Sequence, residues 1–72
     1  MDIRKQTYIV IRKNGEYLVG RILGTKDLRW SQYVYDAYKT RDEKVADALA
    51  RKVGGVKVLF NTVTGQVKVI GA

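Results

Sequence analysis

Apolar and polar residues alternate along residues 7–13, TYIVIRK, and again along residues 16–23, EYLVGRIL. A period of two residues is typical of β-strands that bury one face. Residues 14–15, NG, separate the two runs and form the strongest short signal for a two-residue hairpin turn. The pattern therefore predicts an antiparallel hairpin in which Lys13 pairs with Glu16.

This register divides the side chains of the hairpin between two faces. The first face is wholly apolar and is expected to join the core, where its glycine leaves room for a helix to approach. It carries Ile9, Ile11, Leu18, Gly20 and Ile22. The second face mixes aromatic and basic side chains, and it carries Tyr8, Val10, Arg12, Tyr17, Val19 and Arg21. On this second face Arg12 is expected opposite Tyr17. Tyr8 is likewise expected opposite Arg21.

The period changes to that of a helix within residues 40–55, TRDEKVADALARKVGG. Thr40 and Glu43 have the spacing of a capping box, and Gly54 and Gly55 can end a helix in the left-handed conformation. The apolar stripe consists of Val45, Ala46, Leu49, Ala50 and Val53. A helix of this length is marginal alone, so we expect it to pack on a sheet.

The segment from residue 28 to residue 39, LRWSQYVYDAYK, has two interpretations. It is a third strand, or it is an irregular loop around Trp30 followed by a strand from about Tyr33. In the first interpretation one side carries Ser31, Tyr33, Tyr35 and Ala37, and the other carries Trp30, Gln32, Val34 and Tyr38. The pattern does not decide which side faces inward.

Alternation returns at residues 56–61, VKVLFN, and at residues 66–70, QVKVI, with a turn at 61–65. One face of this predicted hairpin carries Val56, Val58, Phe60, Val67 and Val69. Leu59 and Ile70 are expected on the other face, where they would form a modest apolar patch.

Together these elements predict one small α+β domain over residues 1–72. The expected architecture is an antiparallel sheet of four to five strands, in the order ββ(β)αββ, with one helix packed on one face. The other face of the sheet is expected to be open or used for pairing.

Composition restricts the chemistry of the chain. It contains no Cys and no His, which argues against disulfides, zinc sites and the commonest general base. No pair of carboxylates has the spacing of an acid–base pair, and only Asp36 lacks a structural explanation. We therefore expect no enzyme, no metal and no cofactor. No signal peptide and no apolar run of about 20 residues is evident, so we expect a soluble, cytoplasmic protein without membrane contact.

Charge suggests the kind of partner. The 14 Lys and Arg residues exceed the 7 Asp and Glu residues, for a net charge of +7, which favours polyanions. Aromatic rings stack on bases while cations neutralise phosphates. The candidate nucleic-acid-binding residues are Tyr8, Arg12, Tyr17, Arg21, Arg29 and Trp30. The alternative is that Tyr–Arg pairs merely stabilise a solvated sheet face.

Residues 35–66, YDAYKTRDEKVADALARKVGGVKVLFNTVTGQ, resemble the second half of small phage- and prophage-encoded proteins of Firmicutes-type bacteria. The likeness lies in a strand with an aromatic end, a short helix opening with Thr and an acid, GG, a Val-rich strand and FN before a turn. The chain is also partly similar to the arm-type DNA-binding domains of phage integrases, although two further strands follow its helix. The phage-like resemblance implies a protein that binds nucleic acid or blocks a host protein, including host defence nucleases.

Two functions follow from these observations. The first is nucleic-acid binding through the basic aromatic sheet face, by a non-enzymatic phage-type protein in the host cytoplasm. The second is inhibition of a host or defence complex, as an anti-CRISPR-like counter-defence factor that docks on an acidic or nucleic-acid-associated host protein. An exposed edge strand could also pair two copies into a homodimer.

Overall fold

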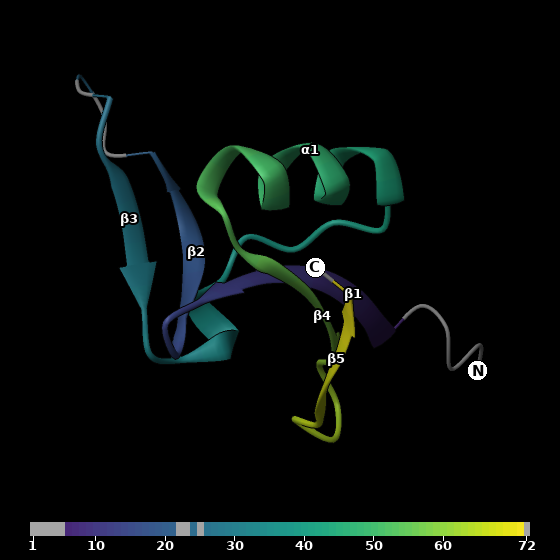
Figure 1. Cartoon of the computed structure of the whole chain (residues 1–72). Coiled ribbons are helices and arrows are strands. Elements are labelled where there is room, and N and C mark those ends of the chain that lie inside the picture. Colours follow the sequence, from purple (N-terminus) through teal and green to yellow (C-terminus); the bar gives the residue numbers. More distant parts are fainter. Residues whose placement is uncertain (1–5, 22–23, 25, 72) are drawn as a thin grey trace.

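A five-stranded antiparallel sheet carries one α-helix on one of its faces (Figure 1). The computed structural model describes residues 6–21, 24 and 26–71. In chain order the elements are β1 (Thr7–Lys13), β2 (Glu16–Arg21), β3 (Leu28–Ser31), the 3₁₀ helix η2 (Val34–Asp36), α1 (Glu43–Val53), β4 (Val56–Asn61) and β5 (Val67–Gly71). The spatial order of the strands is β3-β2-β1-β4-β5. The predicted α+β fold class and the antiparallel sheet are confirmed.

The first hairpin turns as the sequence predicts. Asn14 and Gly15 both have positive φ angles, of 53° and 79°, as a type I′ turn requires. Lys13 pairs with Glu16, and Arg12 lies opposite Tyr17.

Beyond these two pairs the hairpin separates, because another part of the chain occupies the free edge of β1. The N–H of Ile9 donates to the Thr40 carbonyl at 2.7 Å, and the Thr40 N–H donates to the Ile9 carbonyl at 3.1 Å. On the other side of this segment, the Tyr38 N–H donates to the carbonyl of Leu18 at 2.9 Å. The expected pairing of Tyr8 with Arg21 is therefore wrong, since residues 38–40 lie between the two strands.

The β2–β3 hairpin contains a bulge at Gly20. Its register shifts between Leu18 and Gly20, so that Arg21 pairs with Leu28. Gly20 has a φ of 156°, and no atom lies within 4 Å of where its Cβ would be. The expected close approach of the helix to Gly20 is thus wrong. The glycine instead permits the bulge, which turns the hairpin away from β1.

The helix covers the predicted apolar face. Ile9, Ile11 and Leu18 form a buried core with three side chains of α1: Ala46, Ala50 and Val53. The small alanines let the helix axis come close to the sheet, while Leu49 is half-buried and Val45 lies at the exposed margin. The expected core residue Ile22 lies outside the described residues.

The helix begins two residues later than the capping box predicts. Thr40 remains extended because it pairs with Ile9, and its Oγ1 accepts the Asp42 N–H at 3.1 Å. Asp42 is the N-cap, and its carboxylate accepts the N–H of Lys44 at 2.9 Å. Glu43 is therefore the first helical residue, where its negative charge interacts favourably with the helix dipole.

The two glycines after the helix have different roles. Gly54 takes the left-handed conformation, with φ 70°, and both glycine N–H groups donate to the Ala50 carbonyl. Position 55 requires glycine for steric reasons, because a Cβ there would lie 2.9 Å from the Arg12 carbonyl oxygen and 3.0 Å from Ile11 Cγ2. The chain thus enters β4 in direct contact with β1.

The face opposite α1 is exposed at β5, but it is covered over β1, β2 and β4. Val10, Val58 and Phe60 are fully buried there, together with Tyr17 and Ala37. Their cover is the connection from β3 to α1, which contains η2. This correction has a clear cause: the predicted third strand ends at Ser31, and the chain then folds back across the sheet.

The last hairpin has the predicted faces from Val67 to Val69, after which a register shift leaves Ile70 unpaired and places Gly71 opposite Lys57. Val58 pairs with Val69, and Phe60 pairs with Val67, on the side opposite α1. Leu59 does not lie outside as expected, because the α1 side of the sheet is the helix core and Leu59 packs half-buried against it. Among the described residues no helix is long and apolar enough to cross a membrane.

The close contact at Gly55 gives a stability prediction. Gly55→Ala should lower the free energy of unfolding by about 1–3 kcal/mol, because the methyl group overlaps the backbone of β1. Urea denaturation measures the change as a shift in midpoint.

Gly15→Asn is the matched control, since Asn tolerates a positive φ and Gly15 has open space around it. It should change the midpoint much less. Equal losses in the two variants would show that steric contact with β1 is not the reason for Gly55.

Candidate nucleic-acid interface

The six residues predicted to bind nucleic acid do not share one face. Tyr8, Arg12 and Tyr17 lie on the face opposite α1, as the pairing of Tyr8 with Phe60 and of Arg12 with Val56 requires. Arg29 points to the same side, since it alternates with Leu28 and Trp30, which pack on the helix side. Arg21 and Trp30 lie on the α1 side. The bulge in β2 divides the set, because it shifts the alternation of β2 at Gly20.

Two of the predicted stacking rings are already occupied by the protein. Tyr17 is only 7% exposed, and the Arg12 guanidinium carbon lies 5.9 Å from its ring centroid. Tyr17 belongs to the second core, the cluster of Val10, Tyr17, Ala37, Val58 and Phe60 on the face opposite α1. Tyr8 is half-buried, and the Arg41 guanidinium lies 4.1 Å from its centroid. These rings hold cations at the surface but leave little area on which a base could stack.

Trp30 is also a packing residue. Its Cα partner is Leu18, and its ring packs half-buried against the core beneath α1. The sequence pattern could not decide whether this ring faced inward, and the structure assigns it to the helix side.

Exposed aromatic rings occur instead on the connection that covers the second core. Tyr33 is 71% exposed, Tyr35 is 59% exposed, and Tyr38 is also exposed. Between them, Val34 and Ala37 face inward against the second core. Their spacing of three residues is that of a 3₁₀ turn, where residues i and i+3 align. This spacing is the sequence signal that could have placed the tyrosines outside.

Side-chain contacts hold this connection in place. The ring of Tyr35 meets Phe60 edge-on, with centroids 5.0 Å apart and an interplanar angle of 87°. The Lys39 ammonium donates to the carbonyls of Tyr35, at 2.7 Å, and Ala37, at 3.0 Å. Ser31 donates its hydroxyl to the carboxylate of Asp36 at 2.9 Å. Tyr35 therefore has a packing role, whereas Tyr33 presents most of its ring to solvent.

Positive charge accompanies the tyrosines. Strand register places Arg12 and Arg29 on this side, and Lys39 and Arg41 contact the rings of Phe60 and Tyr8. The connection also carries two carboxylates, Asp36 and Asp42. We use the name tyrosine face for the surface formed by Arg12, Arg29, Tyr33, Tyr35, Lys39 and Arg41.

The α1 side balances its charges more closely. Lys57 Nζ lies 2.6 Å from the Asp47 carboxylate, and this hydrogen bond raises the pKa of Lys57 above its ordinary value. The acids Asp42 and Glu43 precede the exposed bases of the helix. This interleaving makes the helix surface a poorer match for a polyanion than the tyrosine face.

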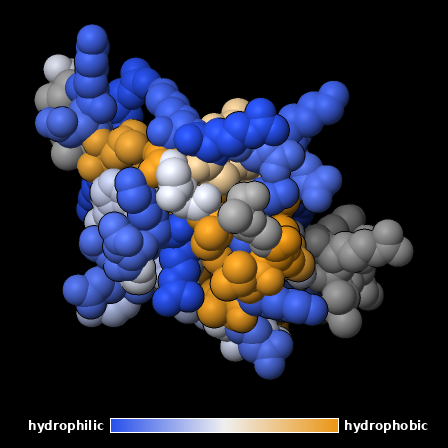
Figure 2. Space-filling view, in the orientation of Figure 1, coloured by the Kyte–Doolittle hydropathy of each residue, from blue (hydrophilic) through white to orange (hydrophobic). Residues whose placement is uncertain are grey.

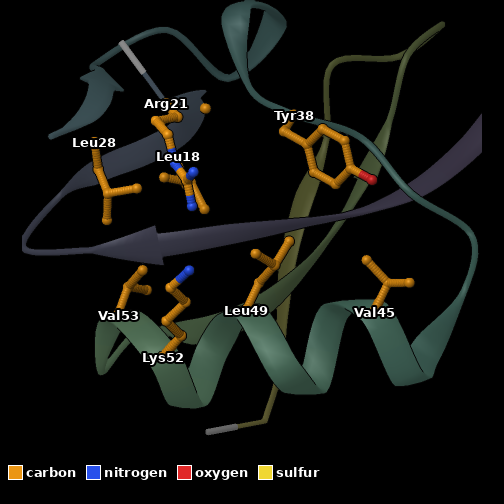
Figure 3. Close-up of a pocket in the computed structure, with 9 residues that line it drawn as sticks. Leu18, Arg21, Leu28, Tyr38, Val45, Leu49, Lys52 and Val53 are labelled. Carbon is orange, nitrogen blue, oxygen red and sulfur yellow. The ribbon is translucent and has the colours of Figure 1, made fainter. Parts of the chain in front are cut away.

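A groove of about 260 Å³ separates α1 from the β2–β3 hairpin. Figure 3 shows apolar side chains of the helix and of the hairpin pointing toward one another across it. The lining residues are Leu18, Gly20, Arg21, Leu28, Tyr38, Val45, Leu49, Lys52 and Val53. Arg21 thus belongs to an apolar groove on the helix side, away from the tyrosine face.

The described residues offer no cluster of three or more metal-ligating side chains. Asp36, the carboxylate singled out from the sequence, is exposed and accepts the Ser31 hydroxyl as part of a surface turn.

The position of Trp30 gives a spectroscopic prediction. Because Trp30 shares the helix-side core with Leu28, the variant Leu28→Ala should expose its ring and shift its emission to longer wavelength. Tyr33→Ala, on the opposite face, should leave the emission unchanged. The chain has one Trp, so steady-state fluorescence measures this ring alone. The reverse pattern would show that Trp30 belongs to the tyrosine face.

Comparison with known proteins does not add a relative. No family model matches the chain, and no curated protein or solved structure matches it either. The resemblance to phage- and prophage-encoded proteins therefore stays a prediction, and the function is argued from the surface.

Proposed function

We propose that this chain is a non-enzymatic protein that binds single-stranded nucleic acid on its tyrosine face. The exposure of Tyr33, at 71%, is the observation that carries the proposal. Unpaired bases have free faces, and stacking on an aromatic side chain is worth about 1–3 kcal/mol per base. A large aromatic ring left in solvent, on a face that also carries cations, is well suited to this use.

The arrangement of cations supports the same proposal. Arg29 lies on β3 and Arg12 lies on β1, with β2 between them, and both side chains are on the face opposite α1. Phosphates spaced along a flexible strand could contact these cations while a base stacks on the ring. Apart from η2 the connection is irregular, and within the described part of the chain α1 lies on the other face of the sheet, so this face suits a flexible single strand better than the groove of a duplex.

The proposal changes the residues that the sequence suggested. Arg12 and Arg29 are retained, and Arg21 is removed. Tyr33 replaces Tyr8, Tyr17 and Trp30 as the stacking ring. Together with the phage-like resemblance, it describes a phage- or prophage-type protein acting on nucleic acid in the host cell.

A second function is favoured by a different observation. The edge strand β5 pairs with β4 on one side only, and it exposes Val67, Val69 and Ile70, which is unusual for an edge strand. Such an edge supports the alternative that the chain inhibits a host or defence complex by docking on a protein.

Two arginines on opposite faces of one hairpin provide the test. Fluorescence anisotropy with labelled single-stranded DNA should show that Arg29→Ala weakens binding and reduces the slope of log K against log salt concentration by about 0.7. Arg21→Ala removes the same charge from the helix side, and it should leave both quantities nearly unchanged. Tyr33→Ala should weaken binding by roughly 5- to 140-fold, the equivalent of one lost stack.

Equal effects of Arg29→Ala and Arg21→Ala would refute the proposal, because they would mean that the net charge binds without a defined site. The same conclusion would follow if Tyr33→Ala bound normally. Labelled RNA and duplex DNA of matched length establish which polymer the face prefers.

A further inference from the structure

The sheet has two edges, and they differ in their protection. At one edge, β3 is four residues long, carries Arg29, and has Leu28 and Trp30 half-buried against the core. At the other edge, β5 exposes 43% of Val67, 56% of Val69 and 38% of Ile70. Figure 2 shows a broad hydrophobic patch over the region of β5 in the orientation of Figure 1. The β5 edge is thus the apolar edge of the sheet.

The backbone of β5 presents hydrogen-bonding groups at this edge. Asn61 donates its N–H to the carbonyl of Gln66 at 3.0 Å, so the backbone groups of Asn61, and those of Leu59 two residues before it, face β5. Antiparallel pairs alternate between bonded and non-bonded, so Lys68, opposite Leu59, also bonds to β4. The N–H and carbonyl groups of Val67 and Val69 therefore point away from β4, toward a strand that could be added.

Side chains along the edge alternate in character. Val67 and Val69 share the face opposite α1, and Lys68 lies between them on the helix side. An incoming strand would meet an apolar, cationic, apolar series in that order. This series specifies the chemistry of its occupant.

A second copy of this chain is a poor occupant. The antiparallel register that bonds Val67 of one copy to Val69 of the other places Lys68 directly opposite Lys68. Like charges directly opposite one another are destabilising, and two chains of net charge +7 repel as well. A register centred on Val69 avoids the lysine pair but gives up the bonds of Val67. Lys68 therefore opposes the homodimer suggested by the sequence.

We propose that β5 is the docking edge for an extended segment of a partner protein, which adds to the sheet as a sixth strand. The segment carries an acidic residue opposite Lys68, with an apolar residue on each side of it to pack beside Val67 and Val69. Main-chain bonds supply the affinity in this mode of recognition, and the alternating side chains supply the selectivity. The site is independent of the proposed nucleic-acid binding, because it uses neither Arg29 nor Tyr33.

Two blocked peptides test the proposal: acetyl-STVEVTS-amide, and the same peptide with Lys in place of Glu. In a titration followed by ¹⁵N–¹H spectra, the Glu peptide should shift the amides of Val67 and Val69 most and slow their exchange with solvent. It should bind about tenfold more tightly than the Lys peptide, because one pairs opposite charges and the other pairs like charges.

Two charge-reversal variants isolate the contact. Lys68→Glu should reverse the preference, so that the Lys peptide binds more tightly. Lys44→Glu makes the same change of net charge in the first turn of α1, and it should keep the preference for the Glu peptide. Val69→Pro removes an N–H that points away from β4, so it should abolish peptide binding while the rest of the spectrum is retained.

Several results would overturn the proposal: no binding of either peptide, equal binding of both, or an unchanged preference in Lys68→Glu. A peptide-free dimer that sedimentation detects and Val69→Pro abolishes would also overturn it in favour of a second copy. Arg29→Ala and Tyr33→Ala leave β5 intact, so they should not change peptide binding. A negative result in the peptide titration is therefore distinguishable from a negative result in the nucleic-acid titration.

Discussion

The paired hydrogen bonds between Ile9 and Thr40, at 2.7 and 3.1 Å, are the constraint on which the rest of this structure depends. They hold the connection before α1 against the free edge of β1, and they separate β1 from β2 after two residue pairs. Together with the bulge at Gly20, this separation directs the β2–β3 hairpin away from β1, and Val34 and Ala37 of the connection pack on the face opposite α1. The central strand becomes buried on both faces, with Ile9 and Ile11 beneath α1 and Val10 beneath the connection.

This constraint also decides which side chains can meet a ligand. A chain of this size buries only part of its surface, so a second small core is a substantial gain in stability. Tyr17 is buried in the core beneath the connection, and Trp30 packs against the core beneath α1. Tyr33 is left as an exposed aromatic side chain, because Val34 and Ala37 on the same segment pack inward. The ligand-facing surface is therefore a consequence of how the sheet is covered.

Much of the fold can be predicted from local patterns. The Asn14-Gly15 turn, the alternation in four of the strands and the alanine-rich helix stripe each act within a few residues. The positions of the candidate site residues are harder to predict, because they depend on contacts between distant parts of the chain. The bulge at Gly20 moves Arg21 to the helix side, and Thr40 is drawn into a strand pairing that displaces the helix cap to Asp42. Neither effect is visible in the period of the sequence.

The central claim is that the connection is docked on the sheet and not a loose loop above an open binding face. Amide hydrogen exchange of Thr40 and Tyr38 measures this most directly, since their N–H groups bond to the carbonyls of Ile9 and Leu18. If the connection is docked, both amides exchange only when the sheet opens, with protection within about tenfold of that of Val10. Exchange of Thr40 and Tyr38 at the rate of the exposed turn residue Gly15, while Val10 stays protected, would contradict the account.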